Sequence, residues 1–366
     1  MSTDWFRSRG PGRICLFGEH QDYMGHRVIA AAIDLAVFIE GEAGPGDAVD
    51  IYLRNFGKRM RFSMNDIRYE DGRDYLRSAV NLLLRKGIIT SCSVRAELWG
   101  TIPIQAGTSS SSALVVAWLA FLIRAAASDP ERYLQPEWLG ELGYLAEVAE
   151  FDEPGGRMDQ YASAFGGIVS LDFSGELDAR PLPMVMREFV LGDSLQPKPT
   201  QKTLKRVRGG QEAGLKALRE LLPFRRSQDV DLDEIKPLLY RLPSELRPYL
   251  RGVIKNREIT SAAAAELMRS QPGQEVLSGL MNEHQVVLRD DLLLSTPRLN
   301  AMIDGALKAG ALAAKINGSG EGGCMFAYCP GRQEVVAEAV ARAGGRPYII
   351  RVEFGAGAEK SSAKRE

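Results

Sequence analysis

The stretch Ile102–Leu114, which reads IPIQAGTSSSSAL, passes from a strand-like run into an apolar helix through small residues alone. Unpaired backbone N–H groups at a helix N-terminus and the positive end of the helix dipole attract anions, and small side chains let a phosphate approach. Serine hydroxyls are also suitable ligands for Mg²⁺. The stretch therefore predicts a phosphate-binding loop, with a serine-rich helix cap as the plainer interpretation. No G-K-[ST] follows it, so it is not the common P-loop.

A second loop, Lys315–Cys324, places four glycines between two strand-like runs. Glycine lets main-chain N–H groups close around a bound group, so this loop could approach the first one from the other domain. A flexible hairpin is the plainer interpretation of the same composition.

A third region, Pro11–His26, begins with a strand that ends in Gly18-Glu19-His20-Gln21-Asp22. Several polar side chains thus stand where the apolar pattern stops, which is how hydroxyl-rich ligands are held. The alternative is a solvated turn. His20 and His26 have no third ligand at a suitable spacing, so a histidine metal site is not indicated.

The chain has 366 residues, which predicts about two domains. A shift in composition near Pro181 places their boundary close to residue 180, and the short charged tail after Gly355 is expected to be frayed. Apolar and β-branched runs predict strands over 13–17, 28–42, 49–53, 60–64, 94–102, 167–173, 188–192, 313–317, 323–329 and 348–354. Helices are expected over 110–127, 138–151, a short stretch through Asp159, a long stretch from about 210 to 310 that follows a polar loop, and 333–343.

The composition is that of an average globular protein, with 45% hydrophobic residues, 25% charged residues and a formal net charge of -1. This excludes disordered, collagen-like and coiled-coil classes, and it provides no global attraction to nucleic acid or anionic lipid. The four cysteines lack metal or disulfide spacing, and no signal peptide or membrane-spanning run is evident. We therefore expect a cytoplasmic protein with neither nucleic-acid nor membrane partners.

In chain order, Pro11–His26, Ile102–Leu114 and Lys315–Cys324 resemble the three motifs of the GHMP small-molecule kinases, and Pro11–His26 is most similar to the galactokinase signature. Gly155–Gln160 resembles the segment that carries the catalytic aspartate of this family, and Val190–Ser194 resembles the strand that opens its second domain. The resemblance covers the whole chain. It implies an α+β fold in two domains: a ribosomal-protein-S5-domain-2-like N-terminal domain (1–180) and a ferredoxin-like α/β C-terminal domain (181–366).

The resemblance implies that ATP and Mg²⁺ take part in the reaction. Asp159 is then the general base or the residue that orients the acceptor hydroxyl, and Arg13 is its electrostatic partner. The resemblance assigns magnesium binding to Ser110 or Ser111 and to Glu147, which is seven residues before Pro154. The nucleotide phosphates are assigned to Ala106, Gly107, Thr108, Ser109, Ser110, Ser111, Ser112, Gly318 and Gly320, and the sugar to Glu19, His20, Asp22, Gly156 and Asp159.

A galactose-like monosaccharide, phosphorylated on its anomeric hydroxyl, is the substrate that the resemblance favours. Met24 stands where galactokinases usually have Asn, the stretch after Ser194 departs from theirs, and Lys205 falls about where they carry a sugar-contacting tyrosine. The alternatives are kinases for arabinose, a uronic acid, fucose or a heptose, and a non-catalytic sugar sensor. Lys198 and Lys205 hint at an acidic sugar, although solvated lysines are the plainer interpretation. A mevalonate-type kinase fits the G-E-H-x-D-Y run less well, and the expected oligomeric state is a monomer or weak homodimer.

Overall fold

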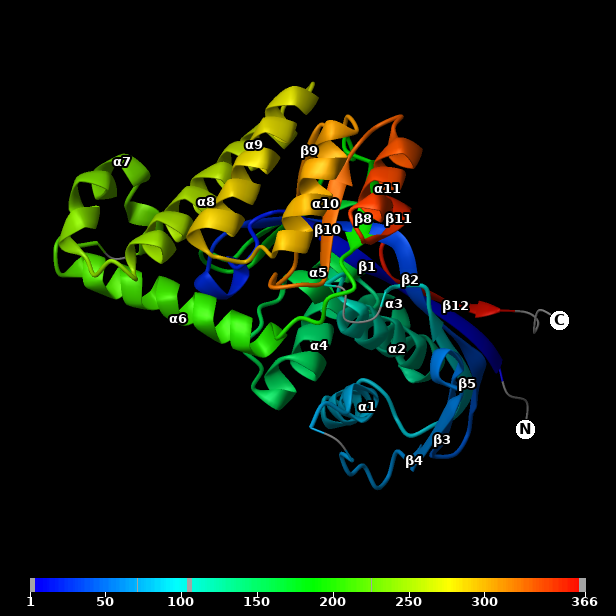
Figure 1. Cartoon of the computed structure of the whole chain (residues 1–366). Helices are drawn as coiled ribbons and strands as arrows, with labels where there is room; N and C mark the ends of the chain where they lie inside the picture. The colour runs from blue at the N-terminus through cyan, green and yellow to red at the C-terminus, as the bar shows by residue number, and fades with distance from the viewer. Residues whose placement is uncertain (1–3, 71, 104–106, 225, 362–366) are drawn as a thin grey trace.

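Two β-sheets organise the computed structural model, which describes residues 4–70, 72–103, 107–224 and 226–361 (Figure 1). Within these ranges the larger sheet has the order β12-β1-β2-β5-β3-β4, with β6 paired to β2 and β7 paired to β6. Its strands are β1 (Asp4–Phe17), β2 (Val28–Gly44), β3 (Ala48–Leu53), β4 (Lys58–Ser63), β5 (Ser93–Gly100), β6 (Ile168–Asp172), β7 (Asp178–Leu182) and β12 (Gly357–Ser361). The smaller sheet, ordered β11-β8-β10-β9, contains β8 (Glu188–Asp193), β9 (Ala313–Asn317), β10 (Cys324–Tyr328) and β11 (Arg346–Arg351).

Helix α2 (Ser110–Ala126) is the centre of the first core. Its side chains from Val115 to Ile123 are fully buried because sheet strands lie on one side and helices on the other. This confirms the buried helix predicted from its uniformly apolar sequence. The other helices of this half are α1 (Tyr75–Arg85), α3 (Pro130–Tyr133), α4 (Pro136–Glu147) and α5 (Met158–Phe165).

The smaller sheet is covered on both faces. Val190, Ile316 and Met325 pack under α10 (Pro297–Lys308) and α11 (Gln333–Arg342). Phe189 and Phe326, on the other face, share a cluster with Phe17 of β1 and Met281 of α9. One apolar core therefore joins the two halves. The remaining helices are α6 (Thr200–Arg219), α7 (Leu232–Ile235), α8 (Arg247–Leu267) and α9 (Gln274–Val286), and the short turns are η1 (Asp22–Met24), η2 (Arg54–Phe56), η3 (Ala149–Phe151), η4 (Ser227–Asp229), η5 (Lys236–Arg241) and η6 (Val287–Asp291).

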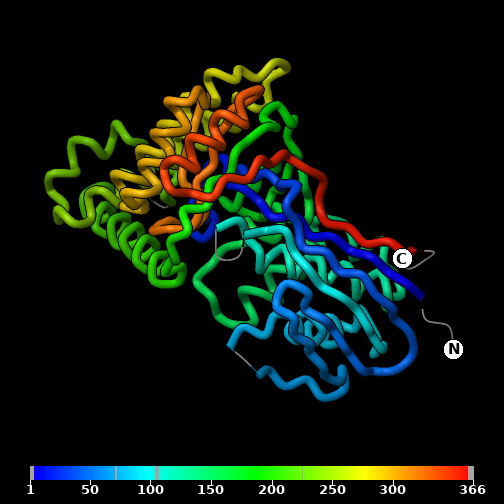
Figure 2. Tube along the Cα trace, turned by 45° about the vertical axis from the view of Figure 1, so that its right-hand side comes forward, coloured from blue at the N-terminus to red at the C-terminus, as the bar shows by residue number. Residues whose placement is uncertain are grey.

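The expected frayed tail is wrong over residues 357–361. These residues form β12, which pairs antiparallel with Trp5–Arg9 at the edge of the larger sheet, so β1 and β12 lie side by side (Figure 2). Its small residues let it lie close to α2, where Arg124 Nε donates to the Ala358 carbonyl at 3.1 Å. The small and charged residues of this segment did not predict a strand, because the strand forms by pairing with β1, which is distant in the sequence.

The start of α6 also differs from the expectation. Residues 200–209, expected to lie in a polar loop, are helical, and Gly210 lies inside the helix rather than at its beginning. A Cβ at Gly210 would lie 2.6 Å from ring atoms of Tyr249, so glycine is needed there for helix packing. Helix α1 was not anticipated, although Leu76, Val80 and Leu83 have helical spacing and are buried.

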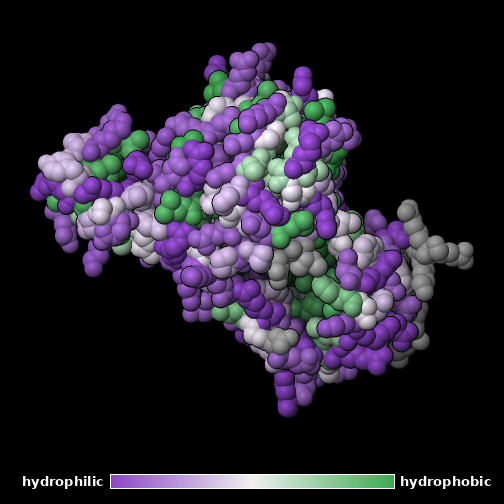
Figure 3. All heavy atoms as spheres, viewed as in Figure 1, coloured by the Kyte–Doolittle hydropathy of each residue, from purple (hydrophilic) through white to green (hydrophobic). Residues whose placement is uncertain are grey.

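On the face shown in Figure 3 polar side chains predominate and apolar ones are scattered. Across the described ranges, no helix combines the length and apolar character needed to cross a bilayer. The four cysteines are buried and unpaired.

Candidate active site

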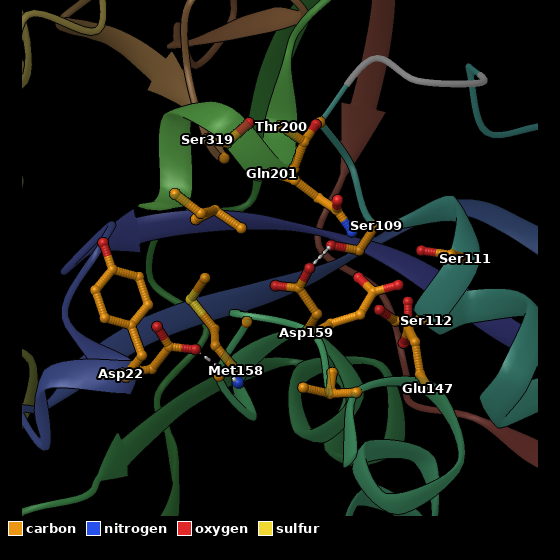
Figure 4. Close-up of a pocket in the computed structure, with 18 of the residues that line it drawn as sticks. Asp22, Ser109, Ser111, Ser112, Glu147, Met158, Asp159, Thr200, Gln201 and Ser319 are labelled. Atoms are coloured by element: carbon orange, nitrogen blue, oxygen red, sulfur yellow. Dashed lines mark hydrogen bonds between the residues drawn. The ribbon is translucent and has the colours of Figure 1, made fainter. Parts of the chain in front are cut away.

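A cavity of about 800 Å³ lies where three segments meet: the segment that follows β1, the serine loop before α2 and the glycine loop between β9 and β10. Its walls come from the end of β1, the N-terminus of α2, the start of α5, the segment before α6 and the loop between β9 and β10. Figure 4 shows Thr200 and Gln201 on one side, Asp22 and Met158 on another, and Asp159 between them. Predicted site residues that line it are Arg13, Glu19, His20, Asp22, Gly107, Ser109, Ser110, Ser111, Ser112, Glu147, Gly156, Asp159 and Gly318.

Asp159 and Arg13 face each other in this cavity. Arg13 Nε and Nη2 lie 2.8 and 2.7 Å from Asp159 Oδ1, and Ser109 Oγ donates to Asp159 Oδ2 (Figure 4). Arg13 is 4% exposed, whereas the Asp159 side chain remains 31% exposed. The carboxylate is therefore fixed from behind by a guanidinium and open toward the cavity.

The serine loop and the glycine loop contact each other at the carbonyl group of Gly107. Gly107 O accepts from Arg13 Nη1 at 2.7 Å and from Asn317 Nδ2 at 2.9 Å. Asn317 Oδ1 in turn accepts from the Cys15 backbone N–H at 2.9 Å. Asn317, which sequence reasoning did not single out, thus connects three segments that are far apart in the chain.

Some predicted phosphate-binding residues lie elsewhere. Thr108 is 1% exposed and does not line the cavity, and Gly320 packs against Leu294 instead. Ala106 lies outside the described residues. Ser109 has φ 58° and immediately precedes α2. Ser109, Ser110 and Ser111 are partly exposed, whereas Gly107 and Ser112 are buried although they line the cavity.

Asp22 forms the wall opposite the serine loop. Its Oδ2 accepts from the Met158 N–H at 3.3 Å, and a Cβ at Gly156 would lie 2.0 Å from that oxygen, so only glycine fits there. Burial, reinforced by the charge of Asp159, raises the pKa of Asp22 to about 6. Asp22 and Gly156, which were both assigned to the sugar, therefore lie in contact with each other.

His20 is bound at both ring nitrogens. Nε2 lies 3.2 Å from the Ser319 carbonyl and Nδ1 lies 2.6 Å from the Tyr23 hydroxyl. Burial lowers the pKa of His20 to about 4, so the ring is neutral at pH 7. A carbonyl accepts only, so Nε2 carries the proton and Nδ1 accepts from Tyr23. His20 thereby ties the signature segment to the glycine loop.

Glu19 is engaged in a buried ion pair. Its Oε2 contacts Lys315 Nζ, and the two residues are 1% and 0% exposed. Lys315 Nζ also donates to the carbonyls of Cys15 and Ile316, each at 2.9 Å. Burial raises the pKa of Glu19 against the opposing effect of Lys315. The sequence signal for Lys315, a lysine inside an apolar strand, was available but was not interpreted.

Glu147, the last residue of α4, lies beside the N-terminal end of α2. It is 6% exposed, and its Oε2 accepts from Gln160 Nε2 at 2.7 Å. Burial raises its pKa, while hydrogen bonds with Ser111 and Ser112 oppose that shift. No lysine or arginine of the described residues forms an ion pair with it. A buried carboxylate beside serine hydroxyls, without a cationic partner, fits a Mg²⁺ site completed by phosphate oxygens.

No group of three or more His, Cys, Asp or Glu within the described part of the chain could hold a metal by itself. This agrees with a site in which one carboxylate and hydroxyl groups leave most coordination positions to substrate phosphates and water.

The comparisons with known proteins agree with this geometry. The GHMP kinases N terminal domain matches residues 74–167, and the GHMP kinases C terminal domain matches residues 264–346. The chain belongs to the GHMP kinase family. The fold is thus the two-domain GHMP kinase fold expected from the motifs, and the protein is a phosphotransferase. The galactokinase galactose-binding signature matches residues 2–42 of this GHMP kinase.

Proteins named mevalonate kinase and proteins named galactokinase are both similar to this GHMP kinase. A mevalonate kinase from Thermococcus gammatolerans is 30% identical, with 93% of this chain and 94% of that protein covered. A galactokinase from Chloroflexus aggregans is also 30% identical, with 86% and 82% covered. Among solved structures, Lactococcus lactis galactokinase complexed with galactose has a TM-score of 0.81 at 22% identity, covering 98% of this chain and 95% of that one. Methanococcus jannaschii mevalonate kinase has 0.69 at 18% identity, covering 95% and 98%.

Proposed function

We propose that this kinase transfers the γ-phosphoryl group of ATP to the anomeric hydroxyl of a galactose-like monosaccharide, giving a sugar 1-phosphate and ADP. The observation that carries the proposal is the position of Asp159, held by Arg13 and open to a cavity with the serine loop on one side and Asp22 on the other. Phosphoryl transfer requires this kind of positioning and charge stabilisation rather than covalent catalysis by the protein.

In the proposed reaction Asp159 accepts a hydrogen bond from the acceptor hydroxyl and receives its proton. The hydroxyl oxygen bonds to the γ-phosphorus while the bond to the ADP oxygen breaks. Arg13 holds Asp159 in place through their ion pair, and its guanidinium can stabilise the negative charge of the transferred group. The N–H groups at the start of α2 and the hydroxyls of Ser110 and Ser111 hold the phosphates.

Magnesium would be held by Glu147 and by the hydroxyls of Ser110 or Ser111. When bound, it would neutralise phosphate charge and orient the terminal phosphate. Gln160 keeps the Glu147 carboxylate in place through its 2.7 Å hydrogen bond.

Polar groups at the acceptor end support a polyol substrate. Asp22 can accept hydrogen bonds from sugar hydroxyls, and the neutral His20 with Tyr23 lies beside it. A site built to pair hydroxyls rejects analogues that lack them, so these residues would set specificity. Lys205 is exposed and does not line the cavity, so it gives no support for an acidic sugar.

A second candidate is mevalonate, because relatives named mevalonate kinase are as similar in sequence as those named galactokinase. The two arginines whose charges act on His20 or Tyr23 have carboxylate partners: Arg206 pairs with Glu321, and Arg208 pairs with Glu212. A mevalonate carboxylate placed beside Asp22 would be repelled. This arrangement favours a neutral polyol.

The test is ADP release against a panel containing galactose, arabinose, fucose, galacturonic acid, a heptose and mevalonate, with the product identified by NMR. The expected result is turnover with a galactose-like sugar and phosphate on the anomeric oxygen. Turnover with mevalonate alone would overturn the substrate assignment. A sugar that raises Tm without any turnover would indicate a sensor.

A further inference from the structure

Lys198 reaches the phosphate loop from the other half of the chain. It lies between β8 and α6 and lines the same cavity as Arg13 and Asp159. A Cβ at Gly107 would lie 3.4 Å from Lys198 Nζ, which places the ammonium group directly against that loop. The proposed mechanism does not yet use this cation.

Among the described residues, no acidic side chain forms an ion pair with Lys198. Two arginines nearby are paired: Arg13 with Asp159, and Arg206 with Glu321. Burial, together with the charge of Arg13, lowers the pKa of Lys198 to about 8. A partly buried ammonium beside a second cation is unfavourable until an anion joins them.

The backbone around Lys198 is held in place. Prolines precede and follow it, which fixes the φ angle on both sides. Gln196 O accepts from the Gly323 N–H at 3.1 Å, and Ser194 N–H donates to Gly323 O at 2.9 Å. These hydrogen bonds attach the segment to the glycine loop, so the backbone that carries Lys198 is held in place.

We propose that Lys198 is a catalytic residue that contacts the γ-phosphoryl group and stabilises its oxygens during transfer. This inference rests on the proposed phosphoryl transfer. As the acceptor oxygen bonds to phosphorus and the bond to ADP breaks, charge is spread over the three remaining oxygens and the leaving β-phosphate oxygen. Arg13 approaches this group from the first half of the chain and Lys198 from the second. The lysine stays protonated throughout, and the acceptor proton goes to Asp159.

The test compares Lys198→Met with Lys198→Arg and with Lys216→Met, which removes an exposed lysine on the following helix α6. With the best sugar from the panel, Lys198→Met is expected to lower kcat about 100-fold. Lys198→Arg should recover much of that loss, and Lys216→Met should match the wild type. The KM for the sugar should change little. A kcat within twofold of wild type for Lys198→Met would overturn the proposal.

Binding measurements separate this proposal from the choice of substrate. The probes are ADP alone and ADP with aluminium fluoride, each in the presence of Mg²⁺ and measured by calorimetry. Lys198→Met should bind ADP as wild type does but lose the tightening that aluminium fluoride produces. Equal loss of ADP affinity in both conditions would place Lys198 at the inner phosphates and overturn the assignment. This readout needs no sugar, so it remains decisive if every sugar fails; thermal melts and Lys198→Gln check that folding is intact.

Discussion

Arg13 and Asp159 lie 146 residues apart in the chain, yet two guanidinium nitrogens of Arg13 contact the same carboxylate oxygen of Asp159, at 2.8 and 2.7 Å. Arg13 comes from the middle of β1 and Asp159 from the first turn of α5, which contacts β1. The other Asp159 oxygen is bound by Ser109 at the start of α2. Three elements therefore fix one carboxylate, and most of the predictions below concern what surrounds it.

Asp159→Asn should lower kcat by about 1,000-fold, because the amide keeps the shape but cannot accept the hydroxyl proton. ATP affinity should stay within about threefold of wild type, since the phosphates are held by the serine loop. Steady-state kinetics and calorimetry provide the two measurements. Asp304→Asn, an exposed residue on α10, is the matched control. Full activity of Asp159→Asn would remove the assigned role.

Asp22 should make sugar use dependent on pH near 6. Its pKa is raised to about 6, so below that pH the carboxyl group is protonated and loses acceptor capacity for sugar hydroxyls. The value of kcat/KM for the sugar should therefore fall as pH falls through about 6. Because a raised carboxyl pKa means that folding disfavours the charged form, Asp22→Asn should raise Tm at pH 7 while sugar use is lost. A pH profile unchanged in Asp22→Asn would contradict this assignment.

Glu147→Gln should raise the Mg²⁺ concentration needed for half-maximal activity by about tenfold, since one anionic ligand is lost. Burial raises the pKa of Glu147, so folding disfavours its charge, and Glu147→Gln should be at least as stable as wild type in magnesium-free buffer. Magnesium titrations of activity and thermal melts give both readouts. Glu137→Gln, exposed on the same helix α4, is the control. An unaltered magnesium requirement would return Glu147 to a structural role.

Lys315→Met should destabilise the protein by about 3–5 kcal/mol, because it leaves the buried Glu19 carboxylate without its cation. The double variant with Glu19→Gln should recover a large part of that loss. Denaturant unfolding monitored by circular dichroism would measure both. If the single and double variants lose the same stability, the ion pair is not what holds this region together.

Truncation after Ala356 removes β12 and should cost about 2 kcal/mol of folding free energy, because Trp5–Arg9 lose their paired strand at the edge of the larger sheet. Truncation after Ser361 keeps β12 and is the matched control. Thermal melts of both would distinguish a paired strand from a dispensable tail, and equal Tm values would support the latter.

The sequence was sufficient where the signal is local. The apolar run from Ser110 to Ala126 specified a buried helix, and β9 at Ala313–Asn317 was placed with its observed bounds. The Gly-Glu-His-Gln-Asp segment, the serine loop and the glycine loop, in this chain order, were enough to indicate the family by their resemblance to its motifs.

The tertiary structure alone decided which polar groups are partners. The pairing of Glu19 with Lys315, the contact of His20 with Ser319, and the approach of Lys198 to Gly107 join residues that no spacing rule connects. The same holds for β12, whose residues become a strand only because β1 offers an unpaired edge. Local sequence fixes backbone preference and apolar periodicity, whereas the partner of a buried charge or an edge strand depends on long-range packing.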